Sequence, residues 1–474
     1  GRIVVLYSAI LRKLDKPEKA KELISELLAY DPIDFAALYE KGLLEGNGML
    51  DQWHKNMQEV DNNYLEIATN YLNAGILDDG IALLSSLKNP TNPLTYYYLA
   101  WFHTQAGDQA KAKDMLSKAK NTSLDYSFPY RKETEEVLKN AIALDPQNVG
   151  AYYLMGNLLY DNRPGDAINA WEKAAAIDNS IPMIWRNLAF GAFYHEKDVD
   201  KAIENLTKAI GEKNDIPLWY AELSQYYDAS TADFRKNLEI LRNNIDIVKK
   251  DVAAPKTLVH LYNLNGEYDE AINLLNTHHF RTWEGGRSIY WRYVDAHTLK
   301  SLQLINEGKY EDAITHLEAA LQYPENLEVG KPSDDEKNAL IYYYMGLAYE
   351  KMNNSKDAKL SYQKSANSKN GRGMDDLLYF QGKANEKLGN TDKANELFKN
   401  LIAIGKEQRE KGSDNSLIAV EEGSVGNSKA ISNSYYLEAL GNKGLGQEAE
   451  AKKLLETALE TYKNNLWAQI MTKE

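Results

Sequence analysis

Small apolar residues recur along the chain at a spacing that fits paired helices. A second small residue follows the first 12 positions later at Ala68/Gly80, Ala100/Ala112, Gly346/Ala358, Gly382/Ala394 and Ala439/Ala451, and at Val259/Ala271 with Val in the first place. The spacing is 11 at Gly156/Ala167 and 13 at Ala189/Ala202. Two helices can cross closely only where neither side chain is bulky. The pattern therefore predicts a series of helix–turn–helix pairs.

A large apolar residue stands four positions after the second small residue of most pairs. These residues are Leu84, Leu116, Trp171, Leu206, Leu275, Leu317, Tyr362, Phe398 and Leu455. Pro closes several units, as in "AYDP" and "ALDP", because the residue before Pro resists helical dihedrals. Each second helix is thus given an apolar face and a definite end.

This register resembles the tetratricopeptide repeat, a helix–turn–helix unit of roughly 34 residues. The resemblance covers nearly the whole chain, with about 11 or 12 recognisable units. It implies an all-α fold, a right-handed superhelical solenoid in which stacked hairpins share one core and leave a concave side. It says little about function, since such arrays serve many partners.

A few segments interrupt the repeat and suggest a division of the chain. Residues 45–63 form a polar interruption, residues 277–297 and 324–338 flank a single unit, and residues 405–434 are rich in Gly and Ser, so that we expect a loop or disorder there. We therefore expect an N-terminal array over 1–276, a central part over 277–338 and a C-terminal array over 339–474. Long insertions in a solenoid gather on one face, often the binding face.

Composition narrows the classes of function. With 43% hydrophobic and 26% charged residues the chain is typical of a soluble globular protein, and its apolar runs fall short of the roughly 18 residues that span a bilayer. The net charge of −14 argues against binding nucleic acid, whose phosphates need a basic face. No cysteine is present, which excludes disulfides, thiolate nucleophiles and Cys-ligated zinc.

The start of the chain, "GRIVVLYSAILRK", has neither an initiator Met nor a signal-peptide pattern. We expect the natural protein to continue upstream. The compartment, cytoplasmic or periplasmic and secreted, stays open.

The segment "THHFRTWEGGRSIYWRYVDAH" (277–297) is the richest candidate for a polar-aromatic site. Glu284 is a possible acid, base or anchor, and Arg281 and Arg287 are suited to a carboxylate or phosphate. Trp283 and Trp291 are suited to stacking on a sugar ring or an apolar side chain. His279 is a further candidate ligand-binding residue of this segment.

A structural interpretation competes with this one: the segment is a long turn whose tryptophans fill the space between repeats. Metal binding is not expected, because His278 and His279 are adjacent and no HExxH-like spacing occurs. The chain also carries no GxSxG elbow, P-loop or strand-associated GxGxxG, and we expect no cofactor.

Tyrosine is abundant, with 32 residues, and the resemblance to tetratricopeptide repeats indicates which aromatic and polar side chains face a ligand. In that family the ligand-facing positions lie on the first helix, three before and one and four after the small residue. Carried over, they include Tyr153, Asn157, Arg186 and Tyr343. The competing account is core packing for about half of them. The Lys/Asn clamp by which some tetratricopeptide domains hold a C-terminal carboxylate is not assembled here.

A narrower resemblance rests on two motifs. "HHFRTWEGG" and "YPENLEVGKP" are similar to segments in the helical-repeat region of a group of bacterial proteins that carry an N-terminal β-sandwich of the galactose-mutarotase type. The matching residues are His279, Phe280, Trp283, Glu284, Gly285, Tyr323, Pro324, Glu325, Asn326, Leu327, Gly330 and Pro332. The resemblance implies an upstream β-sandwich and a connection with carbohydrate. Two motifs that bracket one repeat can also meet in space at a shared site.

Two functions from different classes follow. The preferred one is a non-catalytic scaffold that binds a protein, a peptide or a glycan through its concave face and the segment around Trp283 and Glu284. The alternative is the helical part of a carbohydrate-active enzyme, in which Glu284 and a second carboxylate such as Glu325 act as the acid/base pair that glycoside hydrolysis usually needs.

Overall fold

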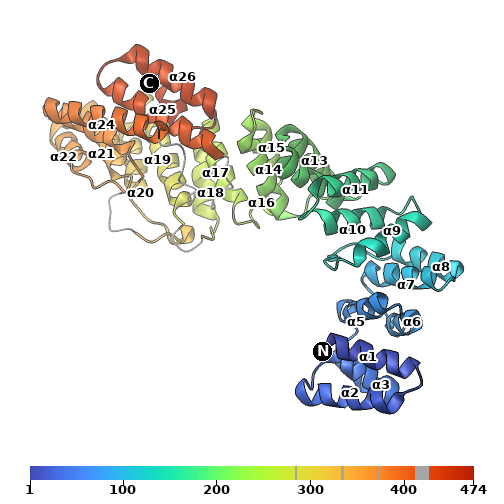
Figure 1. Ribbon diagram of the computed structural model, residues 1–474. Coiled ribbons are helices and arrows are strands. Elements are labelled where there is room, and N and C mark those ends of the chain that lie inside the picture. Colours follow the sequence, from blue (N-terminus) through green and yellow to red (C-terminus); the bar gives the residue numbers. More distant parts are fainter. Residues whose placement is uncertain (283–285, 332–335, 372, 411–425, 474) are drawn as a thin grey trace. The chain divides into compact units, whose positions relative to one another are not determined.

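The structure is a computed structural model that describes residues 1–282, 286–331, 336–371, 373–410 and 426–473. Across these ranges the regular elements are α-helices, with one π-helical turn, one 3-10 turn and no strand (Figure 1). The expected all-α class is confirmed. The chain divides into two compact units, Gly1–Lys197 and Asp198–Glu474, here called unit 1 and unit 2.

Unit 1 is a succession of helix pairs. Its helices are α1 (Arg2–Lys13), α2 (Pro17–Tyr30), α3 (Phe35–Glu45), α4 (Asn47–Met57), α5 (Asp61–Ala74), α6 (Leu77–Ser85), α7 (Pro93–Gln105), α8 (Gln109–Lys120), α9 (Thr134–Leu144), α10 (Val149–Leu159), α11 (Pro164–Ile177), α12 (Pro182–Gly191) and the π-helical turn η1 (Ala192–Glu196). The first helices α5 and α7 lie in one layer and the second helices α6 and α8 in the other (Figure 1). The additional helix α9 packs against both α7 and α10.

Unit 2 continues the same architecture. Its elements are α13 (Val199–Glu212), α14 (Pro217–Ala229), α15 (Phe234–Asn243), α16 (Ile245–Val248), α17 (Ala254–Asn265), α18 (Tyr268–Thr277), α19 (Ser288–Asn306), α20 (Tyr310–Ala320), the 3-10 turn η2 (Glu325–Leu327), α21 (Asn338–Lys351), α22 (Ser355–Ala366), α23 (Leu377–Lys387), α24 (Thr391–Glu410), α25 (Gly426–Gly444), α26 (Glu448–Thr461) and α27 (Leu466–Met471). Each hairpin from α17/α18 to α25/α26 packs against the next.

Local sequence signals set the ends of these helices. The side chains of Asn148 and Asp198 accept hydrogen bonds from the backbone of the first turn of α10 and α13. Pro occupies the first turn of α7, α11, α12 and α14, where no backbone donor is required. Gly266, which ends α17, has a φ of 79°, a left-handed conformation that glycine adopts without strain.

The predicted register between small and large residues is confirmed within single hairpins. A Cβ placed on Gly156 would lie 2.2 Å from Trp171 Nε1, and one on Gly346 would lie 2.5 Å from Tyr362 Cε1. The large residue of each second helix therefore packs directly on the backbone of the small residue in the first helix. A side chain at either glycine would push the hairpin apart.

Two interrupting segments differ from expectation. Residues 45–63 contain α4, which pairs with α3 and buries Trp53 and Met57. Because its few apolar residues fall on one face, a mostly polar segment still makes a helix of the array. In the segment 405–434, α24 extends to Glu410 and α25 begins at Gly426, so both ends are helical, whereas 411–425 lie outside the described residues.

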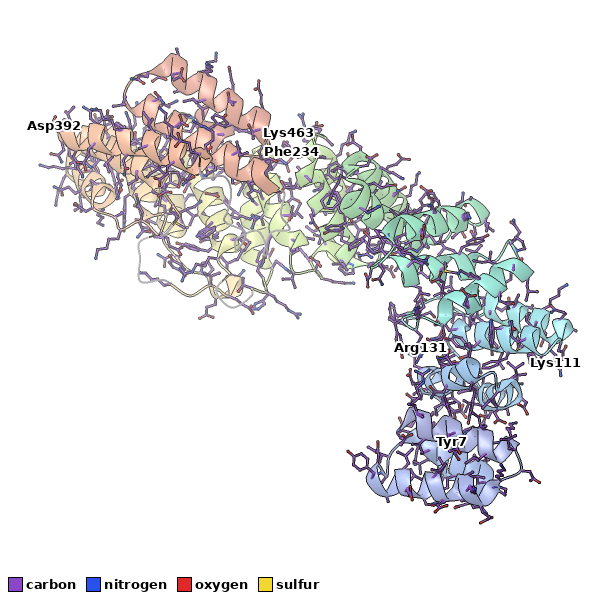
Figure 2. All side chains as sticks on the ribbon, in the orientation of Figure 1. Tyr7, Lys111, Arg131, Phe234, Asp392 and Lys463 are labelled. Atoms are coloured by element: carbon purple, nitrogen blue, oxygen red, sulfur yellow. The ribbon has the colours of Figure 1, made fainter. Side chains whose placement is uncertain are left out.

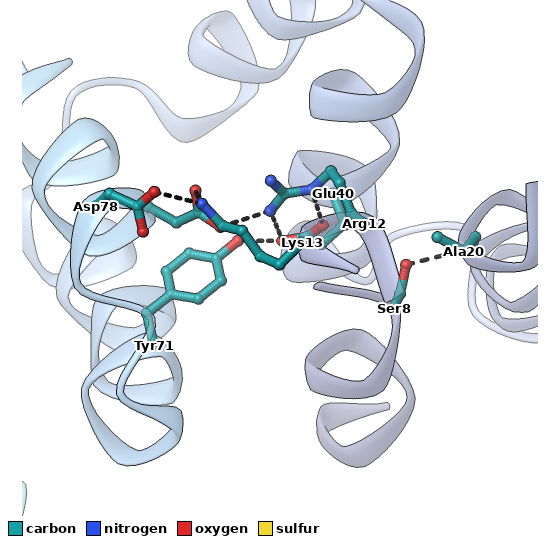
Figure 3. Close-up of polar contacts among 8 residues, drawn as sticks. Ser8, Arg12, Lys13, Ala20, Glu40, Tyr71 and Asp78 are labelled. Carbon is teal, nitrogen blue, oxygen red and sulfur yellow. Dashed lines mark hydrogen bonds and ion pairs between the residues drawn. The ribbon is translucent and has the colours of Figure 1, made fainter. Parts of the chain in front are cut away.

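A buried ionic cluster joins the helices α1, α3, α5 and α6 at the N-terminal end of unit 1 (Figure 3). Arg12 of α1 donates from Nε and Nη2 to the two carboxylate oxygens of Glu40, each at 3.0 Å, and from Nη2 to Asp79 at 2.6 Å. Tyr71 of α5 donates its hydroxyl to Glu40 at 2.5 Å. Glu40 is 0% exposed, so these donors replace the water that its carboxylate would otherwise bind.

A pair of histidines, of which His297 is buried and His316 is half-buried, makes the stability of unit 2 depend on pH. Nδ1 of His297 and Nδ1 of His316 lie 3.0 Å apart, so one ring donates a hydrogen bond and the other accepts it. Burial, aided by the neighbouring His316, lowers the pKa of His297 from 6.5 to about 4.

Between these two pH values the unfolded chain binds a proton at His297 that the folded chain does not bind. The contribution of His297 to the stability of unit 2 is therefore complete above about pH 6.5 and is lost as the pH falls toward about 4. We expect the free energy of unfolding to drop by up to about 3 kcal/mol over that range, measured by urea titration. The double variant His297→Gln/His316→Gln is the control, and an equal pH slope in that variant would contradict the assignment.

Candidate functional site

The two motifs that flank the α19/α20 hairpin meet in space. Phe280 donates its backbone N–H to the carbonyl of Asn326 at 2.7 Å. The Asn326 side chain in turn donates to the backbone carbonyls of Leu275 and His278, each at 2.7 Å. The end of α18 and the 3-10 turn η2 are thus fastened together, and Phe280 is buried beneath the junction.

An exposed carboxylate forms the outer part of this junction. Glu328 accepts from the His279 ring at 2.7 Å and from the Thr282 backbone N–H at 3.2 Å. These hydrogen bonds, that of His279 first, hold the pKa of Glu328 below its usual range. Sequence analysis did not single out Glu328, because only the turn at φ 52° brings its carboxylate to His279.

The remaining candidates of the segment 277–297 are dispersed. Arg287 forms an ion pair with the buried Glu336, whereas Arg281 and Trp291 are exposed. Glu325 is exposed in η2. Trp283 and Glu284 lie outside the described residues, so the roles predicted for them stay predictions.

Asn326→Ala is expected to loosen this junction. The change leaves two backbone carbonyls without their donor, and we expect a loss of about 1–2 kcal/mol in the stability of unit 2. Hydrogen exchange of residues 278–282 is the measurement. Gln322→Ala is the control, because its side chain reaches only the carbonyl of Glu318, in the last turn of the preceding helix α20, at 3.5 Å. Equal exchange in the two variants would contradict the prediction.

In unit 1 a chain of aromatic rings runs from α10 through α12 into η1. Tyr160 stacks on Trp171 with ring centroids 5.3 Å apart and contacts Phe190 at 5.5 Å. Phe190 contacts Tyr194 at 4.5 Å, and the Arg186 guanidinium lies over the Phe190 ring at 5.0 Å. π-helical turns such as η1 are rare and frequently occur at functional sites.

The first-helix positions taken from the family pattern divide into two groups. Asn157 accepts hydrogen bonds from Trp171 Nε1 at 3.1 Å and from Asn187 Nδ2 at 2.9 Å, so it orders the surface between α10 and α12. Tyr153 and Tyr343 are buried, at 6% and 8% exposure, and present little surface to a partner.

A second aromatic surface, which sequence analysis did not single out, follows α8. Residues alternate between exposed and buried from 126 to 131: Ser127, Pro129 and Arg131 are buried, whereas Tyr126, Phe128 and Tyr130 are 90%, 70% and 63% exposed. An alternation of period two is typical of an extended segment, and it holds here although Tyr126 itself lies in a turn at a φ of 57°. The alternation of aromatic and other residues in "YSFPYR" (126–131) could have indicated this surface from the sequence. A pattern of period two is not detected when helical repeats are sought. We call Tyr126, Phe128 and Tyr130 the aromatic row.

Arg131 anchors the aromatic row to the layer of first helices. It donates to the Glu66 carboxylate at 2.8 Å and to the Asn62 carbonyl at 3.0 Å, both on α5. Its guanidinium lies over the Tyr130 ring at 4.3 Å. In Figure 2, Arg131 lies on the side opposite Lys111, which belongs to the second helix α8.

The residues just before the aromatic row and the helix α12 both lie against α10: a Cβ on Gly150 of α10 would lie 3.2 Å from Leu124 Cδ2, and Asn187 of α12 donates to Asn157 at 2.9 Å. Burial raises the pKa of Tyr153, its hydrogen bond with Asn157 lowers it, the Asp125 carboxylate raises it, and the Arg186 guanidinium lowers it. Both charged groups therefore act on one phenol. The residues just before the aromatic row and α12 thus both border α10.

No group of His, Asp and Glu side chains suited to a metal ion occurs among the described residues. In the same part of the chain, no helix combines the length and the apolar character needed to cross a membrane.

Comparison with known proteins gives neighbours in fold. The chain matches no family model. The TPR domain of P58(IPK) shares 15% identity over 84% of this chain and 98% of that chain, with a TM-score of 0.24. The C-terminal part of a TPR repeat-containing protein from Cytophaga hutchinsonii shares 14% identity over 69% and 100%, with a TM-score of 0.23.

A human IFIT1 dimer with PPP-AAAA shares 18% identity over 84% of this chain and 89% of that chain, with a TM-score of 0.26. Scores this low transfer neither the arrangement nor the ligands of these proteins. The assignment rests instead on the helix pairs and on the contacts between small and large residues within them. By that geometry the fold is an all-α array of paired helices, similar to tetratricopeptide repeats.

Proposed function

We propose that the protein is a non-catalytic scaffold that binds a peptide segment of a partner protein on the first-helix side of unit 1. The observation that carries the proposal is the aromatic row, three neighbouring aromatic side chains that are mostly exposed while the residues between them are buried. Soluble proteins seldom leave such apolar groups together in water unless the surface is used.

The chemistry around the row fits a protein ligand. Aromatic rings and arginine are the side chains that contribute most to protein interfaces. Arg186 and Tyr194, which both contact Phe190, add a cationic and an aromatic side chain on α12 and η1, and Asn157 links α10 to α12. An extended peptide would bury its apolar side chains on the rings and direct its polar groups to Arg186 and Asp125.

The other partners that the sequence suggests, a glycan and an upstream β-sandwich, have less support than a peptide, because they rest on the sequence alone. The three-part division of the chain also rests on the sequence alone. For nucleic acid the net charge of −14 is unfavourable. The enzyme alternative requires Glu284, which lies outside the described residues, to act with Glu325.

Selection from a displayed library of random peptides tests the proposal. Peptides are selected on the wild type and their dissociation constants compared with those for the triple variant Tyr126→Ser/Phe128→Ser/Tyr130→Ser. We expect wild-type constants of about 1–100 μM and a loss of about tenfold or more in the triple variant.

A matched control is Tyr30→Ser, since Tyr30 of α2 is 91% exposed and lies outside the proposed surface. Equal affinity of the selected peptides for the wild type and the triple variant would refute the assignment. So would binding of labelled single-stranded RNA or a glycan, but of no peptide, through the same three side chains.

A further inference from the structure

The segment between α26 and α27 reaches helices far away in the sequence. Tyr462 donates its hydroxyl to Asp228 of α14, and Lys463 donates its ammonium group to the carbonyl of Thr231. Asn464 lies 3.5 Å from the same Asp228 carboxylate. Figure 2 places Lys463 beside Phe234, the first residue of α15. These contacts join residues that lie more than 230 positions apart in the sequence.

One turn further along, Trp467 makes the deepest of these contacts. Its indole Nε1 donates to Asp295 of α19 at 3.0 Å, and its ring packs edge-on against Phe380 of α23 at 6.3 Å between centroids. Lys337 donates to the same Asp295 oxygen at 2.5 Å. Trp467 and Asp295 are both buried.

The contacts have a consistent polarity. In the four contacts with Asp228, Thr231 and Asp295 every donor belongs to the C-terminal segment: a phenol, an ammonium, an amide and an indole. Toward its own repeat the segment also accepts, since Lys443 of α25 donates to the carbonyl of Met471 at 3.2 Å. The acceptors are the carboxylates of Asp228 in α14 and Asp295 in α19, and the carbonyl of Thr231 between α14 and α15. A last helix that only covered its own repeat would need contacts such as that of Asn465 with Ser432 of α25, at 3.1 Å. It would not need the contacts with Asp228, Thr231 and Asp295. The receiving surface thus offers two carboxylates and a carbonyl as acceptors, of which Asp295 is also paired with Lys337.

We propose that Asp228, Thr231 and Asp295 form a peptide-recognition surface of unit 2, and that the chain's own segment Tyr462–Met471 occupies it in cis. The surface accepts a segment with a tyrosine and a lysine followed by a tryptophan. Because the tether gives the cis segment an effective concentration in the millimolar range, a free peptide of the same sequence is excluded from the wild type. The proposal is independent of the function proposed for unit 1.

Binding of a free peptide to the full-length protein tests this proposal. The probe is a labelled synthetic peptide of residues 462–473, followed by fluorescence anisotropy. In the variant Trp467→Ala the cis segment loses its indole, and we expect the peptide to bind at least about tenfold more tightly than to the wild type. A peptide with Ala in place of the tryptophan should bind neither protein. Lys473→Ala, an exposed change beyond α27, is the control and should behave as the wild type.

A second variant keeps the proposal falsifiable if Trp467→Ala does not fold. Asp295→Asn preserves the shape of the acceptor and removes its charge. We expect hydrogen exchange in 462–471 to rise by about tenfold while α25 and α26 keep their protection. A folded Trp467→Ala variant that binds the peptide no better than the wild type would overturn the proposal. Equal loss of protection in α25, α26 and the segment would overturn it as well, since the segment would then be an ordinary part of the last repeats.

Discussion

Arg12→Ala is expected to destabilise the N-terminal repeats of unit 1 by about 3–5 kcal/mol. The change removes both hydrogen bonds that Arg12 makes to Glu40 and the one it makes to Asp79. Glu40 is fully buried, so its carboxylate would keep only the hydroxyl of Tyr71 as a partner. A buried charge without its counterion is among the most destabilising changes that a single substitution can make.

The loss should be local, because repeats contact mainly their neighbours and unfold in parts. Hydrogen exchange resolved by segment is therefore the measurement, with the largest increase expected in α1 to α5. Lys21→Ala is the control, since its pair with Glu18 joins two exposed side chains on one helix and is worth only a few tenths of a kcal/mol. The double variant Arg12→Met/Glu40→Leu should recover much of the loss. An Arg12→Ala effect below about 1 kcal/mol would show that water reaches the cluster.

The hairpins were predictable because their determinants are close in sequence. Gly156 and Trp171 are 15 positions apart and meet within one hairpin, so a fixed spacing between small and large residues is enough to identify the fold. Long-range polar contacts lack such a signal. Arg12 and Asp79 lie 67 positions apart, and no periodicity in the chain marks them as partners.

The same limit applies to the candidate sites. The sequence indicated that the motifs around Phe280 and Asn326 can meet, because they bracket one repeat. The structure joins them through one backbone hydrogen bond and two donated by the Asn326 side chain. The pairing of His279 with Glu328 could not be predicted from the sequence, because it depends on the backbone geometry of the turn at Glu328. The aromatic row was missed because an extended segment has a period of two, whereas the search followed the period of helices. The contact of Trp467 with Asp295 spans 172 positions and has no counterpart in the repeat pattern.

Phe398→Ala is expected to destabilise the C-terminal repeats of unit 2 by about 3–5 kcal/mol. Phe398 of α24 is fully buried, and its ring fills the space that two glycines leave. A Cβ on Gly382 or on Gly444 would lie 2.3 Å from a carbon of the ring. Removing the ring leaves a cavity between α23, α24 and α25 that backbones held by their own hydrogen bonds cannot close.

A double-mutant cycle with Gly382→Ala distinguishes this register from a general loss of apolar area. Alone, Gly382→Ala forces a methyl group into the Phe398 ring and should destabilise by about 1–3 kcal/mol. In the background of Phe398→Ala the same methyl enters the cavity, so the two effects should fall short of their sum by about 1 kcal/mol or more. Urea unfolding of the four proteins, read out by hydrogen exchange in α23 to α25, gives the coupling. Strict additivity would mean that the glycine and the ring are not in contact, and the packing rule inferred from the repeat would then fail for this hairpin.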